Sequence, residues 1–520
     1  IFDYFSELFK KEVFNPNIHN IWLKADTALN KTENDNEKKI IKAIAIIYIV
    51  NELDNMPPVQ SIMQAGLGLT NEEYEDAING LIKKHLILKK RSNSFCSFLS
   101  GGNVNISKSI QETKEVRIRK INKREILESI VDLGFLLPKK YNDDYDMIRF
   151  FKNVFVNFDE IINLTSMNSL FKIYKADGLI LHLMYSENDD PTEAIKKINE
   201  LNDGRVILAV PDKPFEKDED LRDYVAIQLL KSDKNFIDGD TTVINELNIY
   251  EEDIAQNIID YIDHLFSPQY GECNYYTNKG KIEGIHNQAQ LNRCVSKICE
   301  QNYRLAPKIN NEMINKNNIS SQILRARSKV IEYIFECFNK SKEMTLEGYG
   351  PETTIYRATI KNKGLCESDK TQDEGLNAVL NEIDAFISNC EKGKKCFSIL
   401  YDRLYSPPYG MRSGVIPIYL AYKLRNCKEN VVIYLGDKEV PLNADNLNRI
   451  NDEPHRYYML IEKGTLEKNK YIENLLELYK DFRNLSNVGY GKLNNVIDAM
   501  RNWIKSLPKY TREYTIILDD

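Results

Sequence analysis

Two predominantly apolar runs, each followed by a stretch with helical periodicity, constrain the fold of this chain most strongly. The runs span residues 177–185 and 205–210, and the helical stretches span 191–201 and 218–230. An alternation of buried strand and helix is typical of parallel strands joined by crossover helices. The pattern therefore predicts a parallel α/β layer.

The first hundred residues carry a different order of signals. Residues 37–53 have the apolar spacing of a buried helix, and a Met-Pro-Pro sequence ends it. A short apolar piece precedes Thr70-Asn-Glu-Glu73, a capping box in which a hydroxyl and a carboxylate each satisfy a backbone amide at the start of a helix. Residues 86–99 then alternate around a Ser-Asn-Ser turn, as hairpin strands do. Helix, short helix, capped helix and hairpin in this order predict a winged helix-turn-helix.

Further strands and helices are expected along the rest of the chain. Residues 115–121 alternate like an exposed strand, residues 353–360 read as another strand, and residues 271–284 read as a hairpin. From residue 397 the order helix, turn, helix and hairpin returns, which predicts a second winged-helix-like module. Amphipathic helices are expected over residues 467–507.

At 520 residues the chain is too long for one hydrophobic core, and about 150 residues per domain suggests about three or four domains. We expect a mixed α/β, predominantly helical, multidomain protein in which winged-helix modules flank an α/β layer. The predicted parts are 1–100, a helical lead-in plus the winged helix-turn-helix; 101–175, a linker strand and helices; 176–266, the α/β layer; 267–345, a hairpin plus long helices; 346–460, the second winged-helix-like module; and 461–520, C-terminal helices.

Bulk properties limit the class of protein. A net charge of −7 excludes a uniformly basic coat for nucleic acid, but it leaves room for a local basic face. The nine cysteines have no repeating spacing, which favours free thiols in the cytoplasm. We find no signal peptide and no apolar run of about 20 residues, so no membrane partner is expected. The chain begins and ends within structured-looking sequence, and we expect it to continue at both ends.

No complete catalytic motif is present. Residues 487–493 have the glycines and lysine of a phosphate-binding loop, but they lack its hydroxyl and its preceding strand, so a plain loop is expected. The hydrophobic and acidic residues 514–520 read as a plain strand.

No Glu-x-Lys strand accompanies the acids of the α/β layer, and no Ser or Cys triad is recognisable. His182 lies in an apolar strand and is expected to be a structural histidine. We therefore expect no metal or cofactor in this chain, and whether it is an enzyme stays open.

Two basic clusters are the candidate nucleic-acid contacts. The first lies at the end of the third helix and along the hairpin of the predicted winged helix, the elements that meet DNA in such folds. The second follows in the expected strand. Each could instead be a solvated charged face, or belong to a module used only for protein packing. The candidate residues are Lys83, Lys84, Lys89, Lys90 and Arg91 in the first cluster, and Arg117, Arg119 and Lys120 in the second.

Several stretches together resemble the part that follows the ATPase domain in very large bacterial phage-defence P-loop ATPases, including those of the BREX type. The resemblance covers most of the chain, through turn and helix signatures instead of catalytic motifs. It implies an ATPase domain N-terminal to this segment, with ATP and magnesium bound only there, and partner subunits that act on DNA to exclude phage. The stretches are residues 21–26, 183–210, 306–313, 320–327, 407–420 and 507–512.

The sequence therefore favours a DNA- or partner-engaging, non-catalytic region of a bacterial antiphage-defence ATPase. Its expected partners are double-stranded DNA and other defence-system proteins, and a homo-oligomer stays open. A protein-interaction scaffold, with winged helices used only for packing, is the first alternative. It predicts that residues 83–91 do not form an exposed cluster. An enzyme is the second, and it predicts an acid-lined pocket at the carboxyl ends of the strands 179–184 and 206–210.

Overall fold

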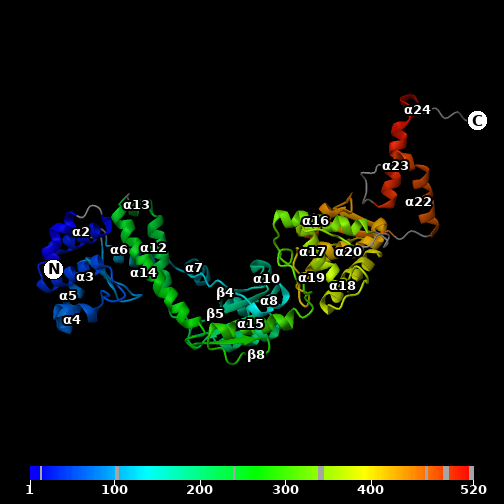
Figure 1. The fold of residues 1–520 in the computed structure, drawn as a ribbon. Coiled ribbons are helices and arrows are strands. Elements are labelled where there is room, and N and C mark those ends of the chain that lie inside the picture. The colour runs from blue at the N-terminus through cyan, green and yellow to red at the C-terminus, as the bar shows by residue number, and fades with distance from the viewer. Residues whose placement is uncertain are drawn as a thin grey trace, which may run out of the picture. The chain divides into compact units, whose positions relative to one another are not determined.

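The computed structural model describes residues 1–11, 15–99, 105–237, 240–337, 345–462, 466–483 and 491–513. The protein is mixed α/β and predominantly helical, which confirms the coarse fold class. It forms two compact units, whose elements are labelled in Figure 1. The first unit contains the chain up to Gly134, Asn153–Leu170 and Leu179–Gln288, and the second contains Phe135–Lys152, Phe171–Gly178 and the chain from Ala289 onward.

The N-terminal module, residues 1–99, has the predicted order of elements. Thr70 and Glu73 form the expected capping box, and the β1–β2 hairpin is antiparallel with Leu88 opposite Ser97. The interior is filled by apolar side chains of α2, α3 and α5, such as Ile44 and Leu81. The elements are α1 (Phe2–Lys11), α2 (Pro16–Asn30), α3 (Asp35–Val50), α4 (Gln60–Leu67), α5 (Asn71–Lys83), β1 (Ile87–Lys89) and β2 (Cys96–Phe98).

The expected α/β layer is also present. Strands β5 and β6 are parallel, with Leu179 opposite Val206, and every residue in both strands is buried. They are central in a six-stranded sheet of order β3-β4-β5-β6-β7-β8, whose β7–β8 hairpin was also predicted. The elements are β4 (Phe151–Asn157), β5 (Gly178–Met184), α11 (Pro191–Leu201), β6 (Val206–Pro211), α12 (Asp218–Ser232), α13 (Lys234–Ile237), α14 (Thr241–Phe266), β7 (Cys273–Thr277) and β8 (Gly280–Lys281).

The strand expected at residues 115–121 is wrong. A helix, α6, extends to Arg117 because Ile106, Ile110 and Thr113 are buried at helical spacing, whereas Val116 is 76% exposed. The short alternation at its end was misread as a strand period. Neighbouring elements are α6 (Ile106–Arg117), α7 (Lys123–Ile130), β3 (Phe135–Leu136), α8 (Lys139–Tyr145), α9 (Phe158–Ile162) and α10 (Asn168–Tyr174).

The strand expected at residues 353–360 is wrong as well. Pro351 opens a helix, α17, whose Ile355, Tyr356 and Thr359 are buried at helical spacing. Packing against α16 outweighs the strand preference of its β-branched residues. The long helices expected within residues 267–345 are present as α15 and α16. This part contains α15 (Gln288–Asn302), α16 (Ser321–Glu336), α17 (Pro351–Thr359), the short 3-10 helix η2 (Lys361–Lys363) and α18 (Glu374–Cys390).

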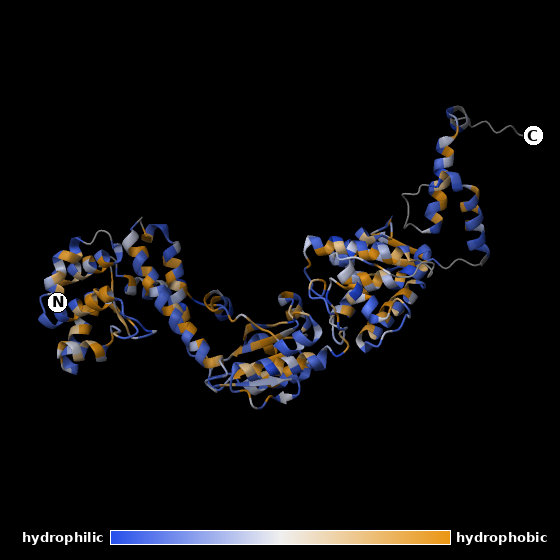
Figure 2. Ribbon diagram, in the orientation of Figure 1, coloured by the Kyte–Doolittle hydropathy of each residue, from blue (hydrophilic) through white to orange (hydrophobic). Residues whose placement is uncertain are grey.

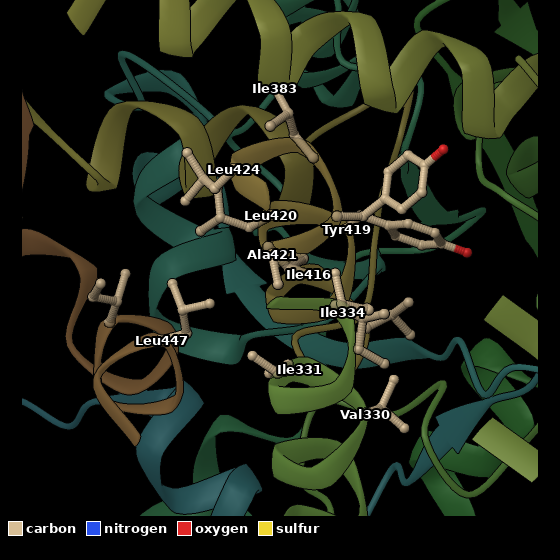
Figure 3. Packing of buried hydrophobic residues seen from close by; sticks show 14 of the residues in the cluster. Val330, Ile331, Ile334, Ile383, Ile416, Tyr419, Leu420, Ala421, Leu424 and Leu447 are labelled. Atoms are coloured by element: carbon tan, nitrogen blue, oxygen red, sulfur yellow. The ribbon is translucent and has the colours of Figure 1, made fainter. Parts of the chain in front are cut away.

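Helix α20 lies at the centre of the second unit, with all of its side chains buried or nearly so (Figure 3). The predicted β10–β11 hairpin turns at Gly436, but the sequence missed β12 and β9, which complete an antiparallel sheet of order β11-β10-β12-β9. The elements are β9 (Lys395–Cys396), α19 (Ser398–Tyr405), α20 (Ile416–Leu424), η3 (Arg425–Asn430), β10 (Val431–Leu435), β11 (Lys438–Val440), α21 (Ala444–Asp452), η4 (Pro454–Arg456) and β12 (Tyr457–Ile461).

The C-terminal part is helical, as expected, with hydrophobic and hydrophilic residues mixed along its helices (Figure 2). Residues 487–490 of the candidate loop, the expected strand 514–520 and residues 101–104 lie outside the described residues. Among the helices that the structure describes, none is long and apolar enough to cross a membrane. The elements are α22 (Leu466–Leu478), η5 (Lys480–Phe482), α23 (Lys492–Ser506) and α24 (Lys509–Glu513).

Candidate partner and nucleic-acid interface

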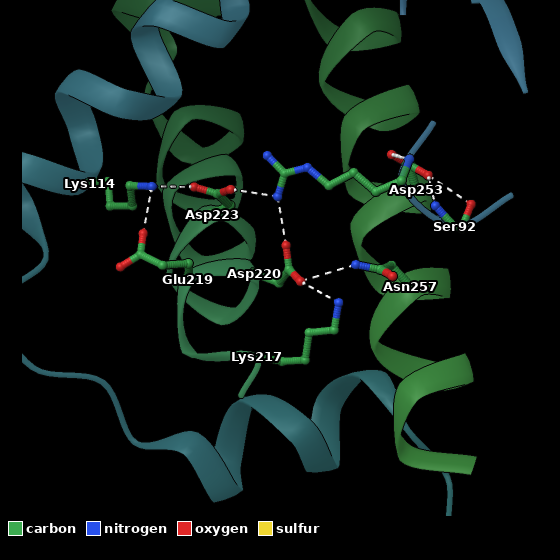
Figure 4. A network of polar contacts seen from close by, with 9 residues as sticks. Ser92, Lys114, Lys217, Glu219, Asp220, Asp223, Asp253 and Asn257 are labelled. Carbon is green, nitrogen blue, oxygen red and sulfur yellow. Dashed lines mark hydrogen bonds and ion pairs between the residues drawn. The ribbon is translucent and has the colours of Figure 1, made fainter. Parts of the chain in front are cut away.

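The tip of the β1–β2 hairpin is bound by carboxylates of α12 and α14 (Figure 4). Nη1 of Arg91 donates to Asp220 Oδ1 at 2.6 Å and to Asp223 Oδ2 at 3.0 Å. The backbone amides of Arg91 and Ser92 donate to the two carboxylate oxygens of Asp253 at 2.8 and 3.0 Å, and the Ser92 hydroxyl adds a third bond. The hairpin tip is therefore packed onto its own chain.

Asp220 and Asp223 also contact further cationic and amide side chains (Figure 4). Lys114 Nζ lies 2.8 Å from Asp223 Oδ1 and 2.9 Å from Glu219 Oε2. Asp220 also forms an ion pair with Lys217, at 3.1 Å, and accepts from an amide side chain on α14 at 3.0 Å. Burial alone would lower the pKa of Arg91, but its hydrogen bonds to Asp220 and Asp223 outweigh burial and raise that pKa. The guanidinium is thus a fixed cation whose charge is already balanced.

The other cations of the first cluster differ in exposure and in partners. Lys84 Nζ donates to the carboxylate of Glu37 and to the Thr32 hydroxyl. Lys83 is exposed at the end of α5, while Lys89 and Lys90 are half-buried in and after β1. Within the described part of the chain, these last three lysines form no ion pair.

The solvent side of α5 is acidic. In the predicted winged helix this helix would enter the major groove. Its exposed side chains include Glu72 and Asp76, with Asn79 one turn further along. Carboxylates at these positions would face DNA phosphates of the same charge, which disfavours the approach of a duplex.

The second cluster is partly neutralised. Arg117 Nη1 lies 3.2 Å from Asp233 Oδ2. Arg119 and Lys120 are exposed in the segment that follows α6, and neither has an ion-pair partner among the residues the structure describes. Lys123 and Arg124, close by, pair with acids of α12 and α9 and with the helix's own Glu128. Of the eight candidate residues, Lys84, Arg91 and Arg117 therefore already have acidic partners.

The α/β layer contains one of the features expected of an enzyme, a pocket at a strand end, but two of the acids that line it already have partners. A pocket of about 550 Å³ lies at the carboxyl end of β5, lined by Ser186, Asp189 and the first residues of α9. Asp189 accepts from the Ser186 amide, and Glu160 accepts from the Asn157 amide and from Arg124. No residue at the end of β6 lines this pocket. In the described ranges, no group of three or more His, Cys, Asp and Glu side chains could hold a metal ion.

His182 is a buried structural histidine, as predicted. Its Nε2 atom lies 3.2 Å from Asn153 Oδ1, and its ring packs edge-on against Phe266. Burial lowers the pKa of His182 to about 3, so the ring is neutral at physiological pH. It holds the strand in place instead of exchanging protons with a substrate.

The residues 407–420 that carried part of the family resemblance form a buried joint in the second unit. Arg149 donates to Asp177 at 2.7 Å and to the Gly410 carbonyl at 2.7 Å, and Arg412 donates to Asp177 at 2.9 Å. Gly410 has a φ of +54°, and a Cβ there would meet the Tyr303 ring at 2.3 Å. The glycine and the arginine of this segment therefore serve packing.

Sequence reasoning missed the acids that hold the hairpin. Asp220 and Asp223 are three residues apart on α12 and almost fully buried, with 8% and 6% of their surface exposed. An acidic pair at that spacing inside a helix's buried face is a signal for a cationic partner, but it does not identify the partner. In comparisons with known protein families, curated proteins and solved structures, no match to this chain was found.

Proposed function

We propose that this chain is the partner-engaging, non-catalytic region of a large bacterial antiphage-defence ATPase, with winged-helix modules that serve protein packing. The observation that carries the proposal is the binding of the hairpin tip, the wing of the first module, by Asp220, Asp223 and Asp253. The assignment to a defence ATPase is supported by the resemblance of residues 407–420 and the other stretches quoted above. ATP and magnesium would belong to an ATPase domain outside this chain.

A comparison of free energies favours packing of the hairpin tip over its binding to DNA. To contact a phosphate, Arg91 would leave two almost fully buried carboxylates, and the loss of one charged partner from each costs roughly 1–2 kcal/mol, since Lys114 and Lys217 remain. A single phosphate contact in physiological salt contributes a binding free energy of about the same size or smaller. The acidic face of α5 adds repulsion. We therefore assign the first module to protein contacts.

The acidic face of α5 also indicates the chemistry of its partner. Glu72 and Asp76 are exposed, and they complement a basic patch on a neighbouring protein. Another protein of the same defence system is the partner we infer. Such a contact would fix the register between subunits and would weaken as the salt concentration rises.

Co-purification tests this function. The tagged protein is expressed with the other proteins of its defence system, as wild type and as Glu72→Lys/Asp76→Lys. The wild type is expected to retain a partner in a defined ratio, and the variant is expected to lose most of it. Glu193→Lys/Glu200→Lys changes the same charge on α11 and should retain the partner. If both variants lose the partner protein, or if both retain it, the proposal that the α5 surface binds this partner is refuted.

Engagement of double-stranded DNA through the first unit is the second candidate. It is favoured by Lys83, Lys89 and Lys90, and by Arg119 and Lys120, which have no ion-pair partner among the described residues. An enzyme in the α/β layer has less support, because Glu160 and Asp189 of its pocket already bind backbone amides and Arg124, and no residue at the end of β6 lines it.

A further inference from the structure

A basic groove in the second unit lies apart from both clusters that the sequence singled out. It has a volume of about 940 Å³ and is built from the segment after α15, from η2, and from the loop that leads into α18. Five cations and two carboxylates line it, which leaves a net charge of +3 in a chain whose net charge is −7. The charged residues are Arg304, Lys308, Lys361, Lys363, Lys370, Asp373 and Glu374.

One carboxylate of the groove is already neutralised. Asp373 accepts from Lys363 Nζ at 2.9 Å, and it also caps α18 by accepting from the Leu376 amide at 3.0 Å. The pair of Lys363 and Asp373 thus contributes no net charge. The four remaining cations face a single acid, Glu374.

Those four cations are available to a ligand. Arg304, Lys308, Lys361 and Lys370 are all exposed. Among the residues described, none of the four forms an ion pair, although the Lys308 ammonium lies 5.0 Å from the centre of the Tyr145 ring. Their common environment is therefore a concave surface with unbalanced positive charge.

The backbone of the groove is not arranged for a single phosphate group. Loops that cradle one nucleotide point free backbone amides at it. Here the amide of Lys308 donates to Asp373, that of Thr371 to Asn377, and that of Gly364 to the Lys361 carbonyl. The free donors are long cationic side chains, which suit a ligand with repeated phosphates.

We propose that this groove binds the sugar–phosphate backbone of a nucleic acid, independently of base sequence. The inference does not rest on the proposed function, because partner binding at α5 can fail while the groove binds, and the reverse. It also moves the nucleic-acid contact from the first unit, where the sequence predicted it, to the second unit.

Fluorescence anisotropy tests the groove. The full chain is titrated into a labelled duplex of about 20 base pairs and into the matching single strand, at about 50 mM and about 200 mM salt. The variant Arg304→Ala/Lys361→Ala/Lys370→Ala should bind at least about tenfold more weakly, and its logarithmic salt dependence should fall by about 3. Tighter binding of one probe identifies the strand form that the groove takes.

The matched control removes three lysines from the predicted first cluster, Lys83→Ala/Lys89→Ala/Lys90→Ala, and should change the affinity less than about twofold. All three groove side chains are exposed, so thermal unfolding should match the wild type. The proposal is overturned if neither probe binds at low salt, or if the control loses as much affinity as the groove variant. It is also overturned if labelled ATP binds the groove while both DNA probes do not.

Discussion

Arg91 and Asp220 lie 129 residues apart in the sequence, and the guanidinium of the first donates to the carboxylate of the second at 2.6 Å. This pair, with Asp223 and Asp253, joins the β1–β2 hairpin to α12 and α14. An exposed hairpin tip is available to DNA, whereas a hairpin tip held by three carboxylates is part of a packed interface. The pair therefore favours a role of this module in protein packing over a role in DNA binding.

Arg91→Ala is expected to destabilise the protein by roughly 1–2 kcal/mol, because Asp223 and Asp220 would each lose one cationic partner. The estimate is modest since 53% of the Arg91 side chain is exposed and Lys114 and Lys217 remain. Urea unfolding followed by circular dichroism measures the change. Arg119→Ala, which removes an exposed arginine without an ion pair among the described residues, should leave the midpoint unchanged. Equal effects of both variants would contradict the account.

Helices and strands were predicted correctly where a short stretch of sequence is enough to recognise them. The capping box at Thr70 and Glu73 and the buried runs of β5 and β6 need only neighbouring residues to be recognised. Residues 115–121 and 353–360 were misassigned because a few alternating or β-branched residues resemble a strand, while buried positions further along set the helical period. Tertiary packing, absent from a short window, decided both cases.

The candidate site could not be predicted in the same way. Whether a lysine or arginine is available to DNA depends on acids that are distant in sequence, such as Asp220 for Arg91 and Glu37 for Lys84. The basic groove likewise takes its charged residues from three segments between residues 304 and 375 that carry no shared motif. Charge counts identify the cations, but only the fold shows which ones lack partners.

Asp177→Asn should destabilise the second unit by about 3–5 kcal/mol, because Arg149 and Arg412 are both buried and would lose their shared counter-charge. Thermal unfolding measures the loss. Asp143→Asn, at an exposed position of α8, is the matched control and should have little effect. A melting temperature of Asp177→Asn equal to that of the control would rule out this role of the joint.

The same carboxylate gives a pH dependence. Burial alone would raise the pKa of Asp177, but the charges of Arg412 and Arg149 outweigh it and hold the pKa below its usual value. Its contribution is therefore fully present above the unfolded pKa of about 3.9 and is lost as the pH falls through the lower folded value. The acid-unfolding curve of Asp177→Asn should lack this component.

His182→Gln should flatten the pH dependence of stability between about pH 6.5 and about pH 3. In the folded protein the ring stays neutral, whereas in the unfolded chain it binds a proton below about pH 6.5, so the wild type loses up to about 1.4 kcal/mol per pH unit as the pH falls. Urea unfolding at a series of pH values measures the slope. The exposed His455→Gln should retain the wild-type slope. An unchanged slope in His182→Gln would show that the ring is protonated in the fold.

The most direct test of the central claim is the affinity of the full chain for double-stranded DNA after Lys89→Ala/Lys90→Ala/Arg91→Ala, measured by anisotropy at low and physiological salt. If the tip of the β1–β2 hairpin packs onto α12 and α14, the dissociation constant should change less than about twofold and the salt dependence should stay the same. A loss of affinity of about tenfold or more, with a salt dependence reduced by about 3, would show that the hairpin contacts DNA and would contradict the account.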